Sequence, residues 1–361
     1  MRAIVDAKAF SEALNSVSKL LPKSTVPILE CVLIRLEKGR CSLTASDLST
    51  YLTLKLPAQG DDFSFALQKP LTAVKACRYF KGELALELTG NDPKYPEAVF
   101  TCGLRSGRFD AYLAEEYPAL PKQEELVSFT ANAADLLKRI ERVKYAVWEP
   151  QGYSYRADQT CVQFSGNDVF CLDGYRAACD TDPALTFPRP FMTWGKSLAY
   201  LKLMGGRDVT VRVGINHIWL TVDAVTICCR NEGVDTFRLM DAVPKHFSEE
   251  FYVSPKDFLR ELDYLDGFQP KRKSPVRFCG GKMALKNALD RCSTSVEIEG
   301  ESEIPFGFDP RFMRDALKQF GGEKRVKVKL SGENGPIILE AEGRNDFALV
   351  LPVRLHETRA A

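Results

Sequence analysis

The sequence predicts an α+β fold in which one unit, a strand followed by a helix and a strand meander, is repeated six times. Three observations lead to this prediction. Six stretches share one pattern of strand, cap and helix, and each is followed by runs with a two-residue period. At 361 residues, the chain also exceeds the usual size of a single core. Units spaced about 60 residues apart are repeats, and six of them pair naturally into three similar domains.

The six stretches read "AIVDAKAFSEAL", "FSFALQKPLTAVKA", "SFTANAADLLKRI", "PFMTWGKSLAYL", "EFYVSPKDFLREL" and "PFGFDPRFMRDAL". We expect one helix in each of the windows 7–21, 67–82, 132–146, 194–207, 254–268 and 308–320. Ser254 and Asp309 are each followed by proline, which suits an N-cap and a first helical position. Asn132 with Asp135 resembles a capping box.

After each helix come alternating runs such as "VTVRVGINHIWLTVD", which are typical of antiparallel hairpins. Proline-containing joins near 118–122 and 243–246 suit domain linkers. The predicted domains are therefore residues 1–122, 123–247 and 248–361. The alternative is that such units recur by chance, since they are common.

Composition narrows the class of protein. The net charge of +1 favours neither nucleic acid nor membrane, and the N-terminus lacks a signal-peptide hydrophobic region. The 11 cysteines form an odd count without CxxC spacing, so we expect reduced and mostly buried thiols. A soluble, unexported protein of the cytoplasm is the expectation.

Charge is unevenly distributed along this nearly neutral chain. The helical windows are basic as a set, although 254–268 is acidic, and the remaining sequence is acidic. One interpretation is ordinary solvated helix faces. The other is that the helices share a surface facing a polyanion and contact its phosphates without reading sequence. Candidate contacts on the helices are Lys75, Arg78, Lys138, Arg142, Lys196 and Lys202.

No pattern for catalysis is present in the sequence. The three histidines, His217, His246 and His356, are far apart, which disfavours a metal cluster or a histidine-based triad. The motifs GxSxG, HExxH, GxxxxGK[ST] and GxGxxG are absent. We therefore expect no catalytic residues, no metal and no cofactor.

Several motifs, spread over all three predicted domains in order, resemble those of the bacterial sliding clamp, the beta subunit of DNA polymerase III. They are "VPILECVLIRLEKGRCSLTASDLSTYL", "GRFDAYLAEEYPALP", "CLDGYRAA" and "LVLPVRL". The resemblance implies the DNA clamp fold, with helices lining a central channel and antiparallel sheets outside. It also implies a head-to-tail homodimer that encircles double-stranded DNA topologically.

The resemblance implies protein partners as well: the DNA polymerase III catalytic subunit, the clamp loader and other proteins with a clamp-binding motif, and no membrane. Such a protein is a processivity factor of the bacterial cytoplasm, associated with the nucleoid. Partners would insert extended peptides into a groove between the second and third domains, with the C-terminal strand as one wall.

Carried over residue by residue, the resemblance assigns to this groove Ala157, Leu172, Gly174, Tyr175, Arg176, Ala177, Leu239, Met240, Asp309, Phe312, Leu349, Leu351, Pro352, Val353, Arg354 and Leu355. Gly174 permits a tight turn, while Arg176 and Arg354 would orient a peptide carboxylate or carbonyl. For Pro352 and its neighbours, the alternative is a plain edge strand.

Further DNA contacts follow from the resemblance: Lys23 in the loop before the "PIL" stretch, and Gln151, Tyr155 and Arg156 in a second-domain loop. Tyr155 equally suits a surface aromatic. The chain departs from the family at Tyr175, where a histidine is usual, at Ala157, where a leucine is usual, and in its final "HETRAA".

Two rival functions remain open. One is a clamp-like protein that no longer closes a ring and acts as a monomeric interaction module or decoy. The other is an enzyme on an unrelated repeat fold, which would need a metal or cofactor. Whether a clamp of this sequence is the main replicative copy or a second copy also stays open.

Overall fold

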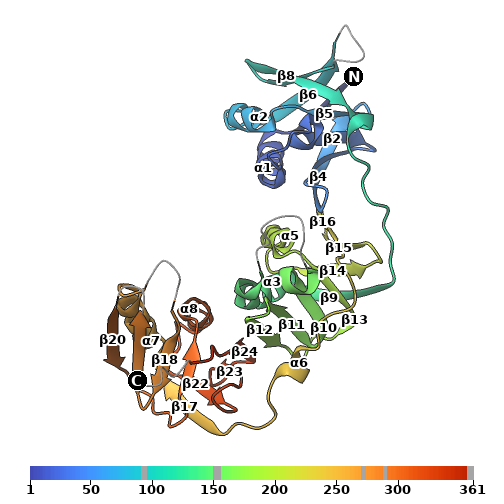
Figure 1. Cartoon of the computed structure of the whole chain (residues 1–361). Coiled ribbons are helices and arrows are strands. Elements are labelled where there is room, and N and C mark those ends of the chain that lie inside the picture. Colours follow the sequence, from blue (N-terminus) through green and yellow to red (C-terminus); the bar gives the residue numbers. More distant parts are fainter. Residues whose placement is uncertain (91–95, 149–155, 270–273, 288–290, 356–361) are drawn as a thin grey trace. The chain divides into compact units, whose positions relative to one another are not determined.

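The structure, a computed structural model, has the α+β architecture that the sequence predicts, with many antiparallel strands and few helices (Figure 1). It describes residues 1–90, 96–148, 156–269, 274–287 and 291–355. The chain forms two compact units, the first from residues 1–137 and 196–231 and the second from residues 138–195 and 232–361.

The first unit contains one sheet of twelve strands, in the order β1-β6-β7-β8-β5-β2-β3-β4-β16-β15-β14-β9, with β1 also pairing with β4. Its strands are β1 (Arg2–Asp6), β2 (Val32–Glu37), β3 (Arg40–Ser46), β4 (Thr50–Gly60), β5 (Phe63–Leu67), β6 (Glu83–Thr89), β7 (Glu97–Cys102), β8 (Arg105–Leu113), β9 (Val127–Asn132), β14 (Asp208–Val213), β15 (His217–Val222) and β16 (Val225–Arg230). Helices α1 (Ala7–Val17) and α2 (Pro70–Cys77) belong to this unit.

The second unit contains an eight-stranded sheet, β13-β10-β11-β12-β24-β23-β22-β17, and a four-stranded sheet, β20-β19-β18-β21. The strands are β10 (Val162–Gly166), β11 (Asp168–Leu172), β12 (Arg176–Thr181), β13 (Phe187–Thr193), β17 (Glu249–Val253), β18 (Val276–Cys279), β19 (Lys282–Asn287), β20 (Cys292–Glu297), β21 (Phe306–Phe308), β22 (Val326–Leu330), β23 (Ile337–Glu340) and β24 (Asp346–Val350). Its helices are α4 (Ala157–Thr160), α6 (Leu239–Ala242), α7 (Pro255–Asp266) and α8 (Pro310–Lys318).

Two helices cross the division between the units along the sequence, namely α3 (Ala133–Val143) and α5 (Gly195–Leu198). Five of the six expected windows contain an α-helix of eight residues or more. In the fourth window the α-helix α5 is short and continues as a 3₁₀ helix, Ala199–Met204, which ends at Gly205 in a positive-φ conformation. This segment is tighter than the amphipathic pattern suggested.

The predicted helix caps are confirmed. The side chain of Ser254 accepts a hydrogen bond from the Asp257 amide of α7, and Asp309 accepts one from the Arg311 amide of α8. Asn132 accepts bonds from the Ala134 and Asp135 amides of α3. These side chains satisfy backbone donors that have no partner inside the helix, so local sequence fixes where each helix begins.

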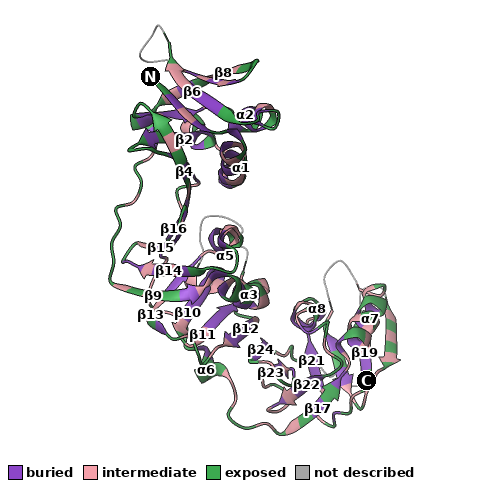
Figure 2. Cartoon of the chain, turned by 180° about the vertical axis from the view of Figure 1, so that it is seen from behind, coloured by how far each residue is buried: buried purple, intermediate pink, exposed green. Residues whose placement is uncertain are grey.

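Burial follows the two expected periods, three to four residues on helices and two on strands (Figure 2). On α1, for example, Phe10, Leu14 and Val17 are fully buried, whereas Lys8 and Glu12 are exposed. On β22, the buried residues alternate with partly exposed Lys327 and Lys329. The helices therefore pack one face on the sheets and present the other to solvent.

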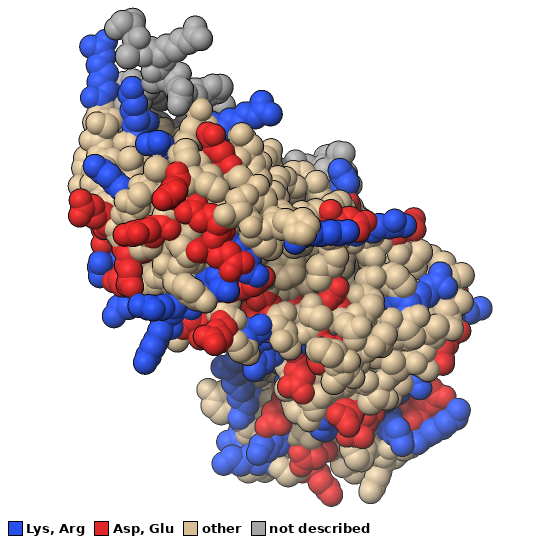
Figure 3. Space-filling model, turned by 90° about the horizontal axis from the view of Figure 1, so that it is seen from below, with Lys and Arg blue, Asp and Glu red and all other residues tan. Residues whose placement is uncertain are grey.

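The outer surface carries both signs of charge. Figure 3 shows Lys and Arg interspersed with Asp and Glu on the face that it presents. Many of these charges form exposed pairs, such as Arg325 with Glu299, 3.1 Å apart, and Lys327 with Glu250, 3.2 Å apart. Pairs of this kind contribute little to stability because water and salt screen them.

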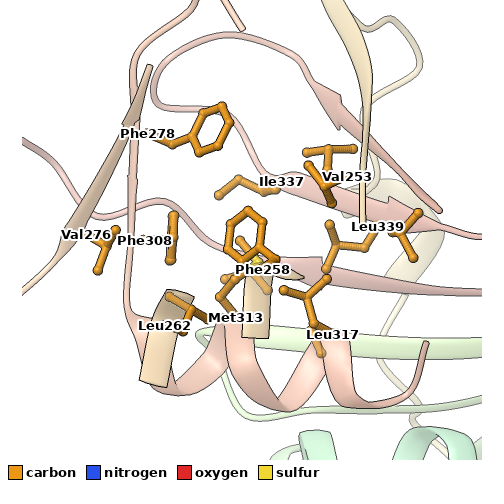
Figure 4. Packing of buried hydrophobic residues seen from close by; sticks show 14 of the residues in the cluster. Val253, Phe258, Leu262, Val276, Phe278, Phe308, Met313, Leu317, Ile337 and Leu339 are labelled. Atoms are coloured by element: carbon orange, nitrogen blue, oxygen red, sulfur yellow. The ribbon is translucent and has the colours of Figure 1, made fainter. Parts of the chain in front are cut away.

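A large hydrophobic core lies in the second unit, where α7 and α8 pack on strands from both of its sheets (Figure 4). Phe258 of α7 lies 6.2 Å from Phe278 of β18 and 5.9 Å from Phe308 of β21, measured between ring centroids. Met313 and Leu317 of α8 belong to the same buried cluster. Arg314 adds an ion pair to Asp266 of α7 at 3.1 Å, which fixes the two helices to each other.

A buried ion cluster in the second unit joins α3 to strands β12 and β24. Asp180 and Asp346 face each other in the register of these strands, and each is about 4% exposed at its side chain. Arg139, also buried, donates to the Asp180 carboxylate at 2.8 Å, and Arg142 donates to it at 2.7 Å. Arg344 donates to Asp346 at 2.6 Å. Buried charges persist only when paired in this way.

We predict that Asp180→Asn lowers the unfolding free energy of the second unit by about 3–5 kcal/mol, because it leaves Arg139 buried without a compensating charge. Urea unfolding followed by circular dichroism measures the change. Asp223→Asn is the control: it removes an exposed pair with Arg207 and should cost less than about 0.5 kcal/mol. Equal effects of the two substitutions would contradict the assignment.

Candidate functional site

The turn between β11 and β12 is held in one conformation by Asp173. Its carboxylate accepts hydrogen bonds from the backbone amides of Tyr175 and Arg176, at 2.9 and 3.0 Å. Gly174 has φ +88°, a left-handed conformation that other residues adopt at a cost. A Cβ atom at Gly174 would also lie 3.1 Å from the side-chain nitrogen of Gln159 in α4. Tyr175 therefore projects from a rigid turn.

The end of the chain lies against this turn. β24 pairs with β12, with Leu349 opposite Ala177 and Val350 opposite Arg176. The strand ends at Val350, so residues 351–355 are not strand, contrary to the expectation of a strand through Leu355. Pro352 has no amide hydrogen to continue a ladder, which explains the early end.

Residues 351–355 are nevertheless anchored. The Leu351 amide donates to the Tyr175 carbonyl at 2.8 Å, and the Val353 amide donates to the Gly307 carbonyl of β21, also at 2.8 Å. A side chain at Gly307 would not fit, because its Cβ atom would lie 2.6 Å from the Val353 carbonyl oxygen. The terminal segment thus extends from the β11–β12 turn to the edge of β21.

The strands that lead to this turn and to the terminal segment carry an apolar cluster, here named the Leu172 cluster. It consists of buried Phe170, Leu172, Ala177, Cys179, Leu239, Ile338 and Leu349, with Val243, Phe247 and Phe347 packed against them. Four of its members, Leu172, Ala177, Leu239 and Leu349, are predicted groove residues. Because β11, β12, β23, β24 and α6 each contribute, distant parts of the sequence converge on one apolar surface.

Exposed apolar side chains lie on the segments that surround the Leu172 cluster. Tyr175 is 63% exposed, Met240 of α6 is 48% exposed, and Leu351 and Val353 are 39% and 36% exposed. The Tyr175 ring stacks on Phe312 of α8, with centroids 5.6 Å apart. Large exposed apolar side chains close together in space are typical of a surface that binds another molecule.

Two of the three charged residues predicted for the groove, Arg176 and Asp309, have partners within the chain. Arg176, expected to meet a bound peptide, donates to Asp173 at 2.9 Å and to Asp315 of α8 at 2.6 Å, and its side chain is only 11% exposed. Its guanidinium also lies 5.0 Å from the Phe312 ring. Asp309 is the N-cap of α8, and Arg354 is exposed. Arg176 therefore holds the β11–β12 turn to α8 through its two carboxylate partners.

Among the DNA candidates of the first unit, Lys75 and Arg78 are exposed at the end of α2. Lys202 is exposed on the 3₁₀ segment, and Lys23 is exposed in a loop. Lys196 lies 3.1 Å from Asp47. These side chains keep their charges accessible to solvent, as phosphate contacts require.

In the second unit, only some of the predicted DNA contacts are exposed to solvent. Lys138 is exposed on α3, but Arg142, expected to contact DNA, donates inward to Asp180. Its carboxylate partners, 38 or more residues away, are not visible in the local pattern. Arg156 is exposed and forms a bidentate pair with Asp158, which raises the pKa of the guanidinium. Gln151 and Tyr155 lie outside the described residues.

No group of three or more His, Cys, Asp or Glu residues in the described part of the chain is placed to hold a metal ion. All 11 cysteines are free thiols and nine are buried, which confirms the expectation for their burial. Burial raises the pKa of the Cys31, Cys41 and Cys77 thiols to about 12. Helices long and apolar enough to cross a membrane are absent from the described residues.

Three residues important to this site were not found from the sequence. Asp173 was readable in principle, because an Asp-Gly pair between strands signals a turn. Asp315, which pairs with Arg176, and Gln163, whose buried side-chain amide accepts a hydrogen bond from the Phe237 amide, were not, because these contacts join residues far apart in the sequence.

The chain is similar in sequence to known sliding clamps. No protein-family model matches it. The beta sliding clamp of Bacillus subtilis is 23% identical over 390 residues, which cover 99% of this chain and 100% of that protein. The beta sliding clamp of Chlamydia trachomatis is 23% identical over 381 residues, covering 99% and 88%.

Solved structures of sliding clamps have the same fold as this chain. The DNA polymerase III subunit beta of Pseudomonas aeruginosa superposes with a TM-score of 0.85 at 16% identity, covering 98% of this chain and 100% of that one. The sliding clamp of Bacillus subtilis superposes with a TM-score of 0.82 at 19% identity, covering 99% and 100%. This chain is a relative of the bacterial beta sliding clamps and has their fold. The resemblance drawn from its motifs is confirmed.

At the β11–β12 turn of this clamp relative, we predict that Gly174→Ala destabilises the second unit by about 1 kcal/mol, because alanine is strained at positive φ. Thermal unfolding measures the effect. The control is Gly322→Ala, beyond the end of α8, where φ is not positive and a Cβ atom would meet no other atom within 4 Å. A Gly174→Ala protein as stable as the control would show that the turn is not under this constraint.

Proposed function

We propose that the chain is a DNA sliding clamp: a ring-shaped homodimeric processivity factor that encircles duplex DNA and tethers the replicative polymerase and other partners through a hydrophobic groove. It acts without catalysis, in the bacterial cytoplasm on the nucleoid. The observation that carries the proposal is the similarity to beta sliding clamps along essentially the whole chain, in both sequence and fold. Three domains, residues 1–122, 123–247 and 248–361, belong to the same proposal.

Two free sheet edges support the formation of a ring. One edge of β8 pairs with β7 along Arg105–Asp110. The other edge pairs with β5 only along residues 111–113, so residues 105–109 have no strand partner on that side among the described residues. β20 is the end strand of its four-stranded sheet. The first edge carries Arg105 and Arg108, while β20 and the residues after it are rich in glutamate. Two copies then join head to tail through edges of opposite charge.

The helices supply the proposed contact with DNA. Lys75 of α2, Arg78 directly after it and Lys138 of α3 are exposed to solvent. Flexible lysines that neutralise phosphates bind every sequence alike, and their attraction falls steeply as salt rises. A closed ring adds retention that does not depend on this attraction, so the clamp slides without dissociating.

The groove supplies the proposed contact with the polymerase catalytic subunit, the clamp loader and other partners. The Leu172 cluster forms an apolar floor, and Tyr175, Met240 and Leu351 supply exposed apolar surface around it. An extended peptide with apolar side chains gains free energy by covering such a surface, at about 25 cal/mol for each Å² buried. The intramolecular pairs of Arg176 leave peptide recognition mainly to apolar contact.

Loading onto DNA tests the ring. A clamp placed by a clamp loader on nicked circular DNA should remain bound at about 0.5 M salt, because topology is not screened, and cutting the circle should release it. The same salt should abolish binding to a short linear duplex. Sedimentation should give about twice the 40.4 kDa chain mass. A strict monomer, or equal salt sensitivity on circle and linear duplex, would instead favour the monomeric module or decoy.

Substitution of the terminal segment tests the groove. We predict that changing Leu351, Pro352 and Val353 together to alanine weakens binding of a fluorescein-labelled clamp-binding peptide from a bacterial polymerase III catalytic subunit by about tenfold or more, through lost apolar surface. The backbone bonds of this segment remain possible, so the dimer should stay intact. Ile215→Ala, an exposed apolar residue of the first unit, is the control. Unchanged affinity in the triple variant would reject the groove.

A further inference from the structure

A glutamine inside strand β10 stands out because its side chain is completely buried. Gln163 is 0% exposed and lies between buried Val162 and Phe164. An amide transferred from water into such surroundings costs free energy unless both of its ends are hydrogen-bonded. A methionine or leucine would fill the space without that cost. The two partners of the amide therefore indicate what this residue does.

Each end of the Gln163 amide holds a different segment. Its nitrogen donates to the Asp158 carbonyl of α4 at 2.7 Å, and its oxygen accepts from the Phe237 amide, also at 2.7 Å. These two segments lie 79 residues apart in sequence, and one side chain bridges them. All of these residues belong to the second unit.

The Phe237 segment leads directly to the proposed groove. The Phe237 carbonyl accepts from the Leu239 amide at 3.1 Å, and Leu239 begins α6 and belongs to the Leu172 cluster. Met240, the next residue, is 48% exposed. Fixing Phe237 thus fixes the start of α6 and the groove side chains on it.

The α4 segment leads to the proposed DNA-facing residue. α4 has only four residues, too few to be stable alone, so it depends on contacts with its surroundings. Arg156 is its N-cap residue and pairs with the Asp158 side chain. On its other side, Gln159 approaches Gly174 of the β11–β12 turn and accepts a hydrogen bond from the Trp148 amide at its carbonyl.

We propose that Gln163 is a positioning residue that couples the groove wall at Leu239 and Met240 to α4 and Arg156. This inference rests on the proposed function. A peptide that orders α6 also orders Phe237, and through the Gln163 amide it orders α4, which carries the DNA-facing side chain. Binding in the groove and contact with DNA then share one hydrogen-bonded bridge, and a coupling of this kind acts in both directions.

Hydrogen exchange of the full-length dimer tests the coupling, with the labelled polymerase peptide as the probe. In the unmodified protein, the peptide should slow exchange in residues 237–242 and also in 157–161. Gln163→Met keeps the side-chain length but loses both hydrogen bonds. It should bind the peptide about tenfold more weakly, and the peptide should no longer slow exchange in 157–161.

The control is Gln269→Met. Gln269 also bridges backbone groups with its side-chain amide, donating to the Ser274 carbonyl at 3.2 Å and accepting from the Ser274 amide at 2.8 Å, after α7 and away from β10. This variant should leave peptide affinity and the exchange of 157–161 unchanged. A similar loss in both variants would overturn the inference, because it would reflect general loosening.

The possible results are distinct. If the unmodified protein binds the peptide but exchange slows only in 237–242, the coupling is rejected while the groove stands, and this result needs no variant to fold. If Gln163→Met binds and protects like the unmodified protein, the coupling is likewise rejected. If the unmodified protein does not bind the peptide at all, the groove fails and the coupling fails with it.

Discussion

The antiparallel pairing of β12 with β24 is the interaction on which the candidate site depends. It places Arg176 opposite Val350 and Ala177 opposite Leu349, residues more than 170 positions apart in sequence. Through this pairing, the β11–β12 turn lies beside the end of the chain, and the Leu172 cluster acquires its contributions from β23 and β24. Without it, the eight-stranded sheet would divide into two four-stranded halves, and neither half would contain the apolar surface.

The same pairing explains why basic residues of α3 turn inward. It brings Asp180 and Asp346 together in a buried position, and two carboxylates so close require cations. Arg139, Arg142 and Arg344 supply them. The basic residues of α3 therefore divide: the arginines hold the helix to the paired strands, and Lys138 is exposed to solvent. A guanidinium suits the first role because its planar fork satisfies several acceptors at once.

Local structure could be predicted from the sequence, and long-range partners could not. Ser254, Asp309 and Asn132 cap helices as expected, because a cap needs only the next few residues. The full-length resemblance predicted the fold, and it named four of the ten residues that form the Leu172 cluster. The sequence does not predict that Arg142 donates inward to Asp180, because its carboxylate partners come together only when β12 pairs with β24. The early end of β24 follows from Pro352, which has no amide hydrogen; the sequence alone is also compatible with an edge strand that continues through this proline.

A crystal structure of the protein with a bound clamp-binding peptide tests most directly whether the β12–β24 pairing builds the binding surface. We expect an extended peptide over the Leu172 cluster, in contact with Met240, Leu351 and the Tyr175 ring, with the β12–β24 register unchanged. A peptide bound elsewhere, or one that binds only after β24 has separated from β12, would contradict the central claim that this strand pairing builds the binding surface.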